Sequence, residues 1–165
     1  MDVSSKPYSV IRIAINYIRY YLTSDTRHDV HSPLVYSFID HVLKPAYPIH
    51  LPMAELKRKE LRASEQYISF IDYGKQGVIT QKSIATMAKN SLKSKKYARV
   101  LASAVRYYQA KQTLELGTSL GITSAYLASA SSSSLVTMEG DPQVAAIAKQ
   151  LWEQLGLHNI KCIIG

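Results

Sequence analysis

Hydrophobic residues in the first part of the chain recur at three- and four-residue intervals, the spacing of amphipathic helices. Ser32-Pro33 is a typical helix start, because serine accepts a free backbone N–H bond and proline lacks the N–H that would stay unpaired. Ser94 is positioned to cap a later helix. The spacing predicts helices over about residues 8–22, 33–43, 53–62, 80–92 and 95–108, the third of them mostly solvated.

From Gln112 onward the pattern changes to short apolar runs separated by helical stretches. Apolar runs of this length, bounded by turn residues, are typical of buried strands. The alternation of strand and helix predicts a parallel α/β unit with right-handed crossovers. The predicted strands cover residues 113–116, 135–139 and 160–164, and the helices between them 122–130 and 142–155.

One short strand is also predicted inside the helical part, at Ile68–Ile71, followed by the turn Asp72–Gly77. The turn either ends the strand or forms a lid over a ligand, and the strand-ending role is favoured. We therefore divide the chain into a helical N-terminal segment, residues 1–93, and an α/β part, residues 94–165.

Composition is that of a folded protein of about one domain, since 47% of the 165 residues are hydrophobic and 19% are charged. The net charge of +8 favours polyanionic partners such as nucleic acid. The basic residues are spread out, however, and cluster only at Lys57–Lys59 and Lys93–Lys96. A nucleic-acid partner is therefore an alternative and is not favoured.

A single cysteine, Cys162, excludes a disulfide framework and a cysteine metal site within the chain. His28 and His31 precede a helix start and have no evident third ligand, so we expect no metal. The apolar stretch Val10–Leu22 is too short to span a bilayer, and no signal-peptide pattern is present. Its amphipathic helix is expected to pack on the core or a partner chain rather than lie on a membrane. These features predict a cytoplasmic protein.

The turn after the first strand of the α/β part carries the chemistry. Its glycines, Gly117 and Gly121, do not fit a dinucleotide loop, because Ser119 and Ile122 stand where the second and third glycines belong. Glu115 would repel a pyrophosphate, but it suits a ligand with an ammonium and a sulfonium. Glu139 ends the next strand, 22 positions after Gly117, where a carboxylate can accept both hydroxyls of a ribose.

The run Leu114–Thr123 resembles motif I of class I S-adenosylmethionine (SAM)-dependent methyltransferases, closest to the small-molecule O-methyltransferase type. Val136–Pro142 is similar to the acidic motif that follows it, and His31–Pro33 and Asp72–Gly74 resemble features of predicted bacterial methyltransferases. The resemblance implies an incomplete Rossmann-like methyltransferase fold, with parallel strands in the order 3-2-1, preceded by a helical N-terminal segment. It also implies SAM as the cofactor.

Carried over by position, the resemblance assigns the glycine loop to the methionine part of the cofactor. Gly117 and Gly121 let the backbone pass it, Thr118 and Ser119 lie between them, and Glu115 is near the amino group.

Three further residues complete the predicted cofactor site: Thr123 near the carboxylate, Glu139 at the ribose and Gly140 near the adenine. The catalytic residues and strands four to seven of such a fold are expected beyond residue 165, so we expect a truncated domain.

The first function predicted is methyl transfer from SAM to a small-molecule acceptor. The alternatives are a non-catalytic SAM-binding or interaction module and, less favoured, an RNA methyltransferase. With the strand order 3-2-1, the strand Thr113–Leu116 becomes a sheet edge, whose bare N–H and C=O groups are a template for pairing. We therefore expect a homodimer.

Overall fold

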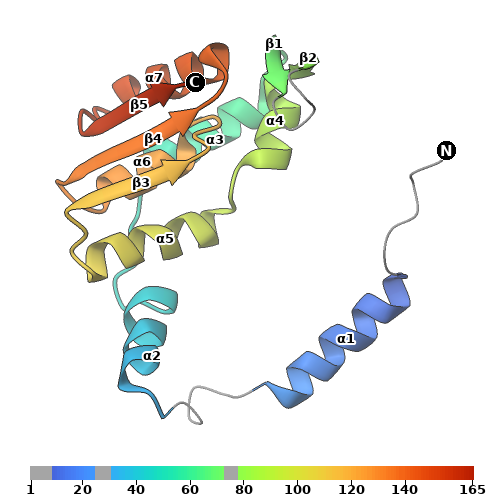
Figure 1. Ribbon diagram of the computed structural model, residues 1–165, viewed down its shortest axis with the longest axis vertical. Coiled ribbons are helices and arrows are strands. Elements are labelled where there is room, and N and C mark those ends of the chain that lie inside the picture. The colour runs from blue at the N-terminus through green and yellow to red at the C-terminus, as the bar shows by residue number, and fades with distance from the viewer. Residues whose placement is uncertain (1–8, 25–30, 73–77) are drawn as a thin grey trace. The chain divides into compact units, whose positions relative to one another are not determined.

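The computed structural model describes residues 9–24, 31–72 and 78–165 (Figure 1). His28 and Tyr73–Gly77, which belong to two of the motifs above, lie outside these residues. The elements are α1 (Val10–Thr23), α2 (Pro33–Phe38), the π-helical turn η2 (Ile39–Leu43), α3 (Pro52–Ala63), β1 (Tyr67–Asp72), β2 (Val78–Ser83), α4 (Ile84–Ser91), α5 (Lys95–Tyr107), β3 (Gln112–Leu116), α6 (Ile122–Ser129), β4 (Ser134–Glu139), α7 (Pro142–Gln154) and β5 (Ile160–Ile164).

The chain forms two compact units, Met1–Ile39 and Asp40–Gly165. In the first unit Ser9 caps α1, accepting a bond from Arg12 N at 3.3 Å, and every side chain of α1 is exposed. Ser32 caps α2 in the same way through Val35 N, which confirms the predicted start at Ser32-Pro33. No helix in the described residues is long and apolar enough to cross a membrane.

The central sheet of the second unit is parallel, with the strand order β3-β4-β5. This confirms the predicted order and leaves β3 at one edge. The register pairs Glu115 with Thr137 and Leu116 with Met138. Because side chains alternate along a strand, Glu115 and Thr137 share one face of the sheet and Leu116 and Met138 share the other.

The two faces of this sheet differ in burial. Leu135 and Thr137 are fully buried on the face that packs against α6 and α7. Leu114 and Leu116, on the opposite face, are 63% and 75% exposed. In Figure 1, α6 and α7 are drawn behind the three strands. The second unit therefore covers one face of its sheet with helices and leaves apolar side chains exposed on the other.

The helix α5 packs against α6 mainly through small residues, and several of its bulky apolar residues stay exposed. Ala98 and Ala102 are fully buried, whereas Tyr97 is 61% and Leu101 43% exposed. The alanines join a core with Ala125 of α6. Small side chains let α5 and α6 approach closely, so most of the bulky apolar residues of α5 lie outside this contact.

The prediction of one helix over about residues 80–92 is wrong in its first part. Val78–Ser83 forms β2, which pairs antiparallel with β1, and the helix α4 begins only after it. Ser83 is the cap, because its Oγ accepts a bond from Thr86 N at 3.2 Å. At residues 80–83, hydrogen bonding to β1 therefore outweighed the helical spacing of the sequence.

More than half of the residues of the charged helix α3 are exposed, as predicted, but one side of the helix packs against α6 and carries a buried ion pair within α3. Arg58 is only 5% exposed, and its Nε lies 3.1 Å from Glu55 Oε2. The Tyr126 hydroxyl of α6 donates to Glu55 Oε1 at 2.9 Å. Burial, followed by the bond to Glu55, raises the pKa of Tyr126 to about 12. The phenol therefore stays protonated and joins α3 to α6.

The start of α6 is fixed by close contact with α7. Gly121, the N-cap of α6, has φ +78°, and a Cβ placed on it would lie 2.8 Å from both Ala148 Cβ and Trp152 Nε1. The Trp152 indole N–H donates to the Gly121 carbonyl at 2.9 Å. Only glycine suits both the left-handed backbone and this approach.

We predict that Gly121→Ala lowers the free energy of unfolding by roughly 3 kcal/mol, from backbone strain and overpacking together. Gly156→Ala is the matched control: this residue also has positive φ, +67°, but a Cβ there would meet nothing within 4 Å. We expect that control to cost only about 1–2 kcal/mol, the strain alone. Urea unfolding followed by circular dichroism measures both, and equal losses would contradict the packing argument.

Candidate functional site

The candidate site lies where β3 and β4 end side by side. Gly117 N and Thr118 N both donate to the Met138 carbonyl at 3.0 Å, so the glycine loop starts directly against the end of β4. The carboxyl ends of parallel strands are where folds of this class bind ligands. The two motifs that the sequence singled out are therefore brought together in space.

Glu139 joins the end of β4 to this loop. Its Oε2 accepts a bond from Ser119 N at 2.8 Å, and its Oε1 accepts one from Asp141 N at 3.2 Å. A carboxylate offers about four lone-pair positions, so each oxygen keeps room for a further donor. Two such donors, one on each oxygen, are what the two hydroxyls of a ribose present.

Asp141 fixes the direction of the chain after Glu139. Its Oδ1 accepts bonds from Gln143 N at 2.8 Å and Val144 N at 3.0 Å, which caps α7. Gly140 lies half-buried in the bend between β4 and this cap. The helix predicted over residues 142–155 thus begins where expected, and its cap holds the chain after Glu139 in place.

The two loop glycines have different surroundings. Gly117 has φ +91°, and an added Cβ would meet nothing within 4 Å, so its open side leaves space for a ligand. At Gly121, side chains of α7 occupy the space where a Cβ would lie, so packing explains the need for glycine there. Ser119 also has positive φ, +49°, and its hydroxyl lies 2.8 Å from that of Ser91 at the end of α4.

Glu115 points to the helix-covered face of the sheet. Its Oε2 accepts bonds from Ser124 Oγ at 2.5 Å and Thr137 Oγ1 at 2.8 Å. Burial raises the pKa of the Glu115 carboxyl, and the two hydrogen bonds partly oppose the rise. The carboxylate thus ties β3 to β4 and to α6.

Thr118 and Thr123 take different positions in the loop region. Thr118 is 3% exposed, and its hydroxyl lies 2.6 Å from that of Thr137, so its side chain points into the protein interior. Thr123 is half-buried in the first turn of α6. The contacts predicted between these residues and a cofactor stay predictions.

Three partners of the site were not identified from the sequence: Ser124, Thr137 and Trp152. Thr137 could have been found, because it is a hydroxyl inside an apolar strand and pairs with Glu115 in register. Ser124 and Trp152 reach the loop only through the packing of α6 and α7. Among the residues that the structure describes, no cluster of His, Cys, Asp and Glu could hold a metal ion.

We predict that Glu115 makes stability depend on pH. A raised pKa means that folding favours the protonated carboxyl, so this stabilisation is full below the ordinary pKa of 4.5. It is lost as pH rises through the raised value of the folded state. Glu115→Gln removes the titration, so its unfolding free energy relative to the parent protein should increase between pH 4 and pH 8. Urea unfolding across this range measures the difference in unfolding free energy. A difference that does not change with pH would contradict a raised pKa of Glu115 in the folded state.

No family model matches the sequence, and no curated protein matches it. Solved structures, in contrast, match the fold of the chain. The S-adenosylhomocysteine (SAH)-bound methyltransferase PaMTH1 of Podospora anserina aligns with 98% of this chain and 52% of its own, at a TM-score of 0.54 and 13% identity. An O-methyltransferase of Bacillus cereus, solved with SAH, aligns with 80% of this chain and 50% of its own, at a TM-score of 0.52 and 21% identity.

A third neighbour is TomG of Streptomyces achromogenes, an O-methyltransferase solved with SAM. It aligns with 82% of this chain and 52% of its own, at a TM-score of 0.50 and 18% identity. The chain thus spans about half the length of each of these structures. It has the Rossmann-like fold of class I SAM-dependent methyltransferases over that portion.

Proposed function

We propose that the chain carries the cofactor-binding part of a SAM-dependent methyltransferase that acts on a small-molecule acceptor. The observation that carries this proposal is the bond from Ser119 N to Glu139 Oε2 at 2.8 Å beside the open side of Gly117. A carboxylate that can accept ribose hydroxyls lies next to a turn whose backbone is not covered by a side chain. A ligand that joins a nucleoside to an amino acid requires both.

The chemistry of the donor set fits SAM better than a dinucleotide. Two carboxylates, Glu115 and Glu139, flank the loop, and neither pairs with a cation in the described part of the chain. Such a site disfavours a pyrophosphate and favours a ligand with cationic groups. Glu139 would hold the ribose hydroxyls, and the backbone at Gly117 would lie along the methionine part.

When bound, SAM supplies a methyl group that its sulfonium makes electrophilic. The contribution of this chain is to bind and orient. Glu139 and the Asp141 cap fix one end of the site, and the contact between Gly121 and α7 fixes the loop at the other. Positioning of this kind supplies much of the rate increase in a group transfer between two bound molecules.

The two O-methyltransferases among the structural neighbours support O-methylation as the reaction type. We propose that residues 1–93 form the acceptor-side or oligomerisation region and residues 94–165 the cofactor-binding part. The single, unpaired cysteine, Cys162, supports a reducing compartment, and we propose a cytoplasmic location.

Calorimetry with SAM and SAH tests the cofactor site. We expect binding to the parent chain and a loss of roughly 10- to 100-fold in affinity for Glu139→Ala, because two hydrogen bonds to a charged group disappear. Glu153→Ala, at an exposed acid of α7, is the matched control and should bind as the parent does. A thermal unfolding scan of each variant shows whether it is folded.

Three results would count against this proposal. Absence of heat with both ligands would mean that the folded chain has no cofactor site of its own. Equal affinities for the Glu139 and Glu153 variants would remove the ribose role from Glu139. Binding without methyl transfer to any acceptor would support a non-catalytic SAM-binding module instead.

We also propose that two copies associate through β3. The support is that β3 ends the sheet and that Leu114 and Leu116 are 63% and 75% exposed on the adjoining face. A row of unpaired backbone groups beside exposed apolar side chains favours pairing with a second chain.

Light scattering tests the association and is expected to give the mass of two chains at micromolar concentration. Leu114→Lys should weaken the dimer at least about tenfold, because a leucine buried in the contact stabilises it by about 1.5–3 kcal/mol. Tyr47→Lys is the control, since Tyr47 is 84% exposed and lies outside β3. A mass of one chain at that concentration would overturn the proposal.

A further inference from the structure

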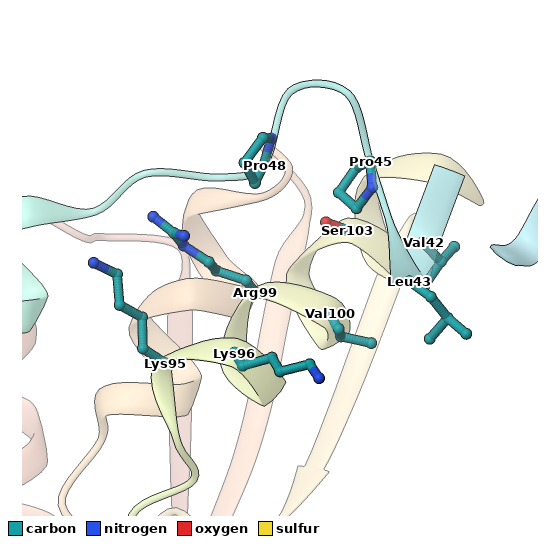
Figure 2. A pocket seen from close by; sticks show the side chains of 9 residues that line it. All are labelled: Val42, Leu43, Pro45, Pro48, Lys95, Lys96, Arg99, Val100 and Ser103. Carbon is teal, nitrogen blue, oxygen red and sulfur yellow. The ribbon is translucent and has the colours of Figure 1, made fainter. Parts of the chain in front are cut away.

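A cavity of about 300 Å³ lies between the loop after η2 and the helix α5 (Figure 2). It shares no residue with the candidate cofactor site. Its lining consists of Val42, Leu43, Pro45, Pro48, Lys95, Lys96, Arg99, Val100 and Ser103.

The charged groups of this lining are all cationic. Lys95 and Arg99 are one helical turn apart, and Figure 2 shows both side chains extending to the same side of α5, at the left of the view. Lys96 extends to the opposite side, the side on which Val100 lies. Like charges four residues apart on a helix repel each other. The cavity lining contains no acidic residue that would balance them.

Two polar atoms in this lining are buried without a hydrogen-bond partner: Ser103 Oγ and Arg99 Nε. Ser103 is 1% exposed, and its hydroxyl points toward the space beneath Pro45 and Pro48 in Figure 2. Buried polar atoms of native proteins nearly always have a partner, which is protein, water or ligand. A hydroxyl and a guanidinium N–H in this lining are therefore two donors that a bound water or ligand can engage.

Arg99 forms no ion pair within residues 9–24, 31–72 and 78–165. Arg99 Nη2 lies 2.9 Å from Nε2 of His50, a group without negative charge. Glu55, an acid of α3, is engaged by Arg58 and by the Tyr126 hydroxyl. The opposite wall of the cavity is apolar, with Val42 fully buried.

We propose that this cavity binds a small organic anion. Its carboxylate or phosphate group contacts Lys95, Arg99 and Ser103, and its apolar body packs against Leu43, Val100 and the prolines of the loop. Arg99 Nε and Ser103 Oγ donate the bonds that they lack in the unliganded chain. An anion with an apolar body is required because the lining is charged on one side and hydrocarbon on the other.

The test is calorimetry with phenyl phosphate and benzoate on the whole chain, with inorganic phosphate and benzyl alcohol as controls. We expect at least one of the two aromatic anions to bind, and to bind more tightly than inorganic phosphate or the uncharged alcohol. The stronger of the two identifies the charged group. SAH at saturation should leave this binding unchanged, because the two sites share no residue.

Variants assign the binding to the cavity. Lys95→Gln and Arg99→Gln should each weaken it about tenfold or more, because each removes a charge-assisted bond. Ser103→Ala should weaken it several-fold, since a neutral bond is lost. Arg62→Gln removes an exposed charge of α3 outside the cavity and should have no effect. Lys95 is exposed, so that variant is expected to fold even if the buried substitutions do not.

Several results would overturn the proposal. No binding of either aromatic anion at millimolar concentration would do so, and so would equal binding of inorganic phosphate, which would leave the apolar wall without a role. A loss in Arg62→Gln as large as in Lys95→Gln would show only a general effect of charge. Displacement by SAH would place the anion in the cofactor site instead, and failure of SAH to bind at all would leave this test unaffected.

Discussion

The contact between α7 and Gly121, the N-cap of α6, is the constraint on which the site depends. Ala148 and Trp152 occupy the space where a side chain of residue 121 would stand, and the indole N–H holds the Gly121 carbonyl. With that end fixed, and with Gly117 N bound to the Met138 carbonyl at the other, the loop has little freedom. Ser119 N is then directed to Glu139, which brings together the two motifs that lie 20 residues apart.

The two carboxylates of the site have different surroundings and therefore different uses. Glu115 is buried, and two hydroxyls donate to the same oxygen, so it serves mainly to join strand, strand and helix. Glu139 accepts one backbone N–H on each oxygen and remains able to accept more. Glu115 thus stabilises the strands and helix that carry the loop, whereas Glu139 offers a contact to a ligand.

Small residues in the interior leave bulky apolar residues at the surface. Alanines of α5 and α6 form the contact between these helices, and Tyr97, Leu114 and Leu116 stay exposed. Apolar side chains that gather at a surface are typical of places where proteins meet partners. The proposed pairing through β3 and the anion cavity beside α5 use separate parts of the second unit.

The sequence by itself determined the local elements and the positions of the two motifs. Helix starts at Ser32, Ser94 and Asp141 were predictable because capping is an interaction between neighbours in the chain. The strand order and the meeting of Gly117 with Glu139 were predictable because the resemblance supplied the topology. The predicted roles of the cofactor residues rest on that same resemblance.

Tertiary structure alone decided which faces pack and which partners each polar group finds. β2 replaced the first turn of a predicted helix because it pairs with β1, and α5 buried its alanines because α6 approaches closely. Gly121 proved to be required by Trp152, a residue 31 positions away. The cationic cavity joins residues of two segments about 50 positions apart. Such contacts depend on distances between elements, which periodicity and propensity along a chain do not contain.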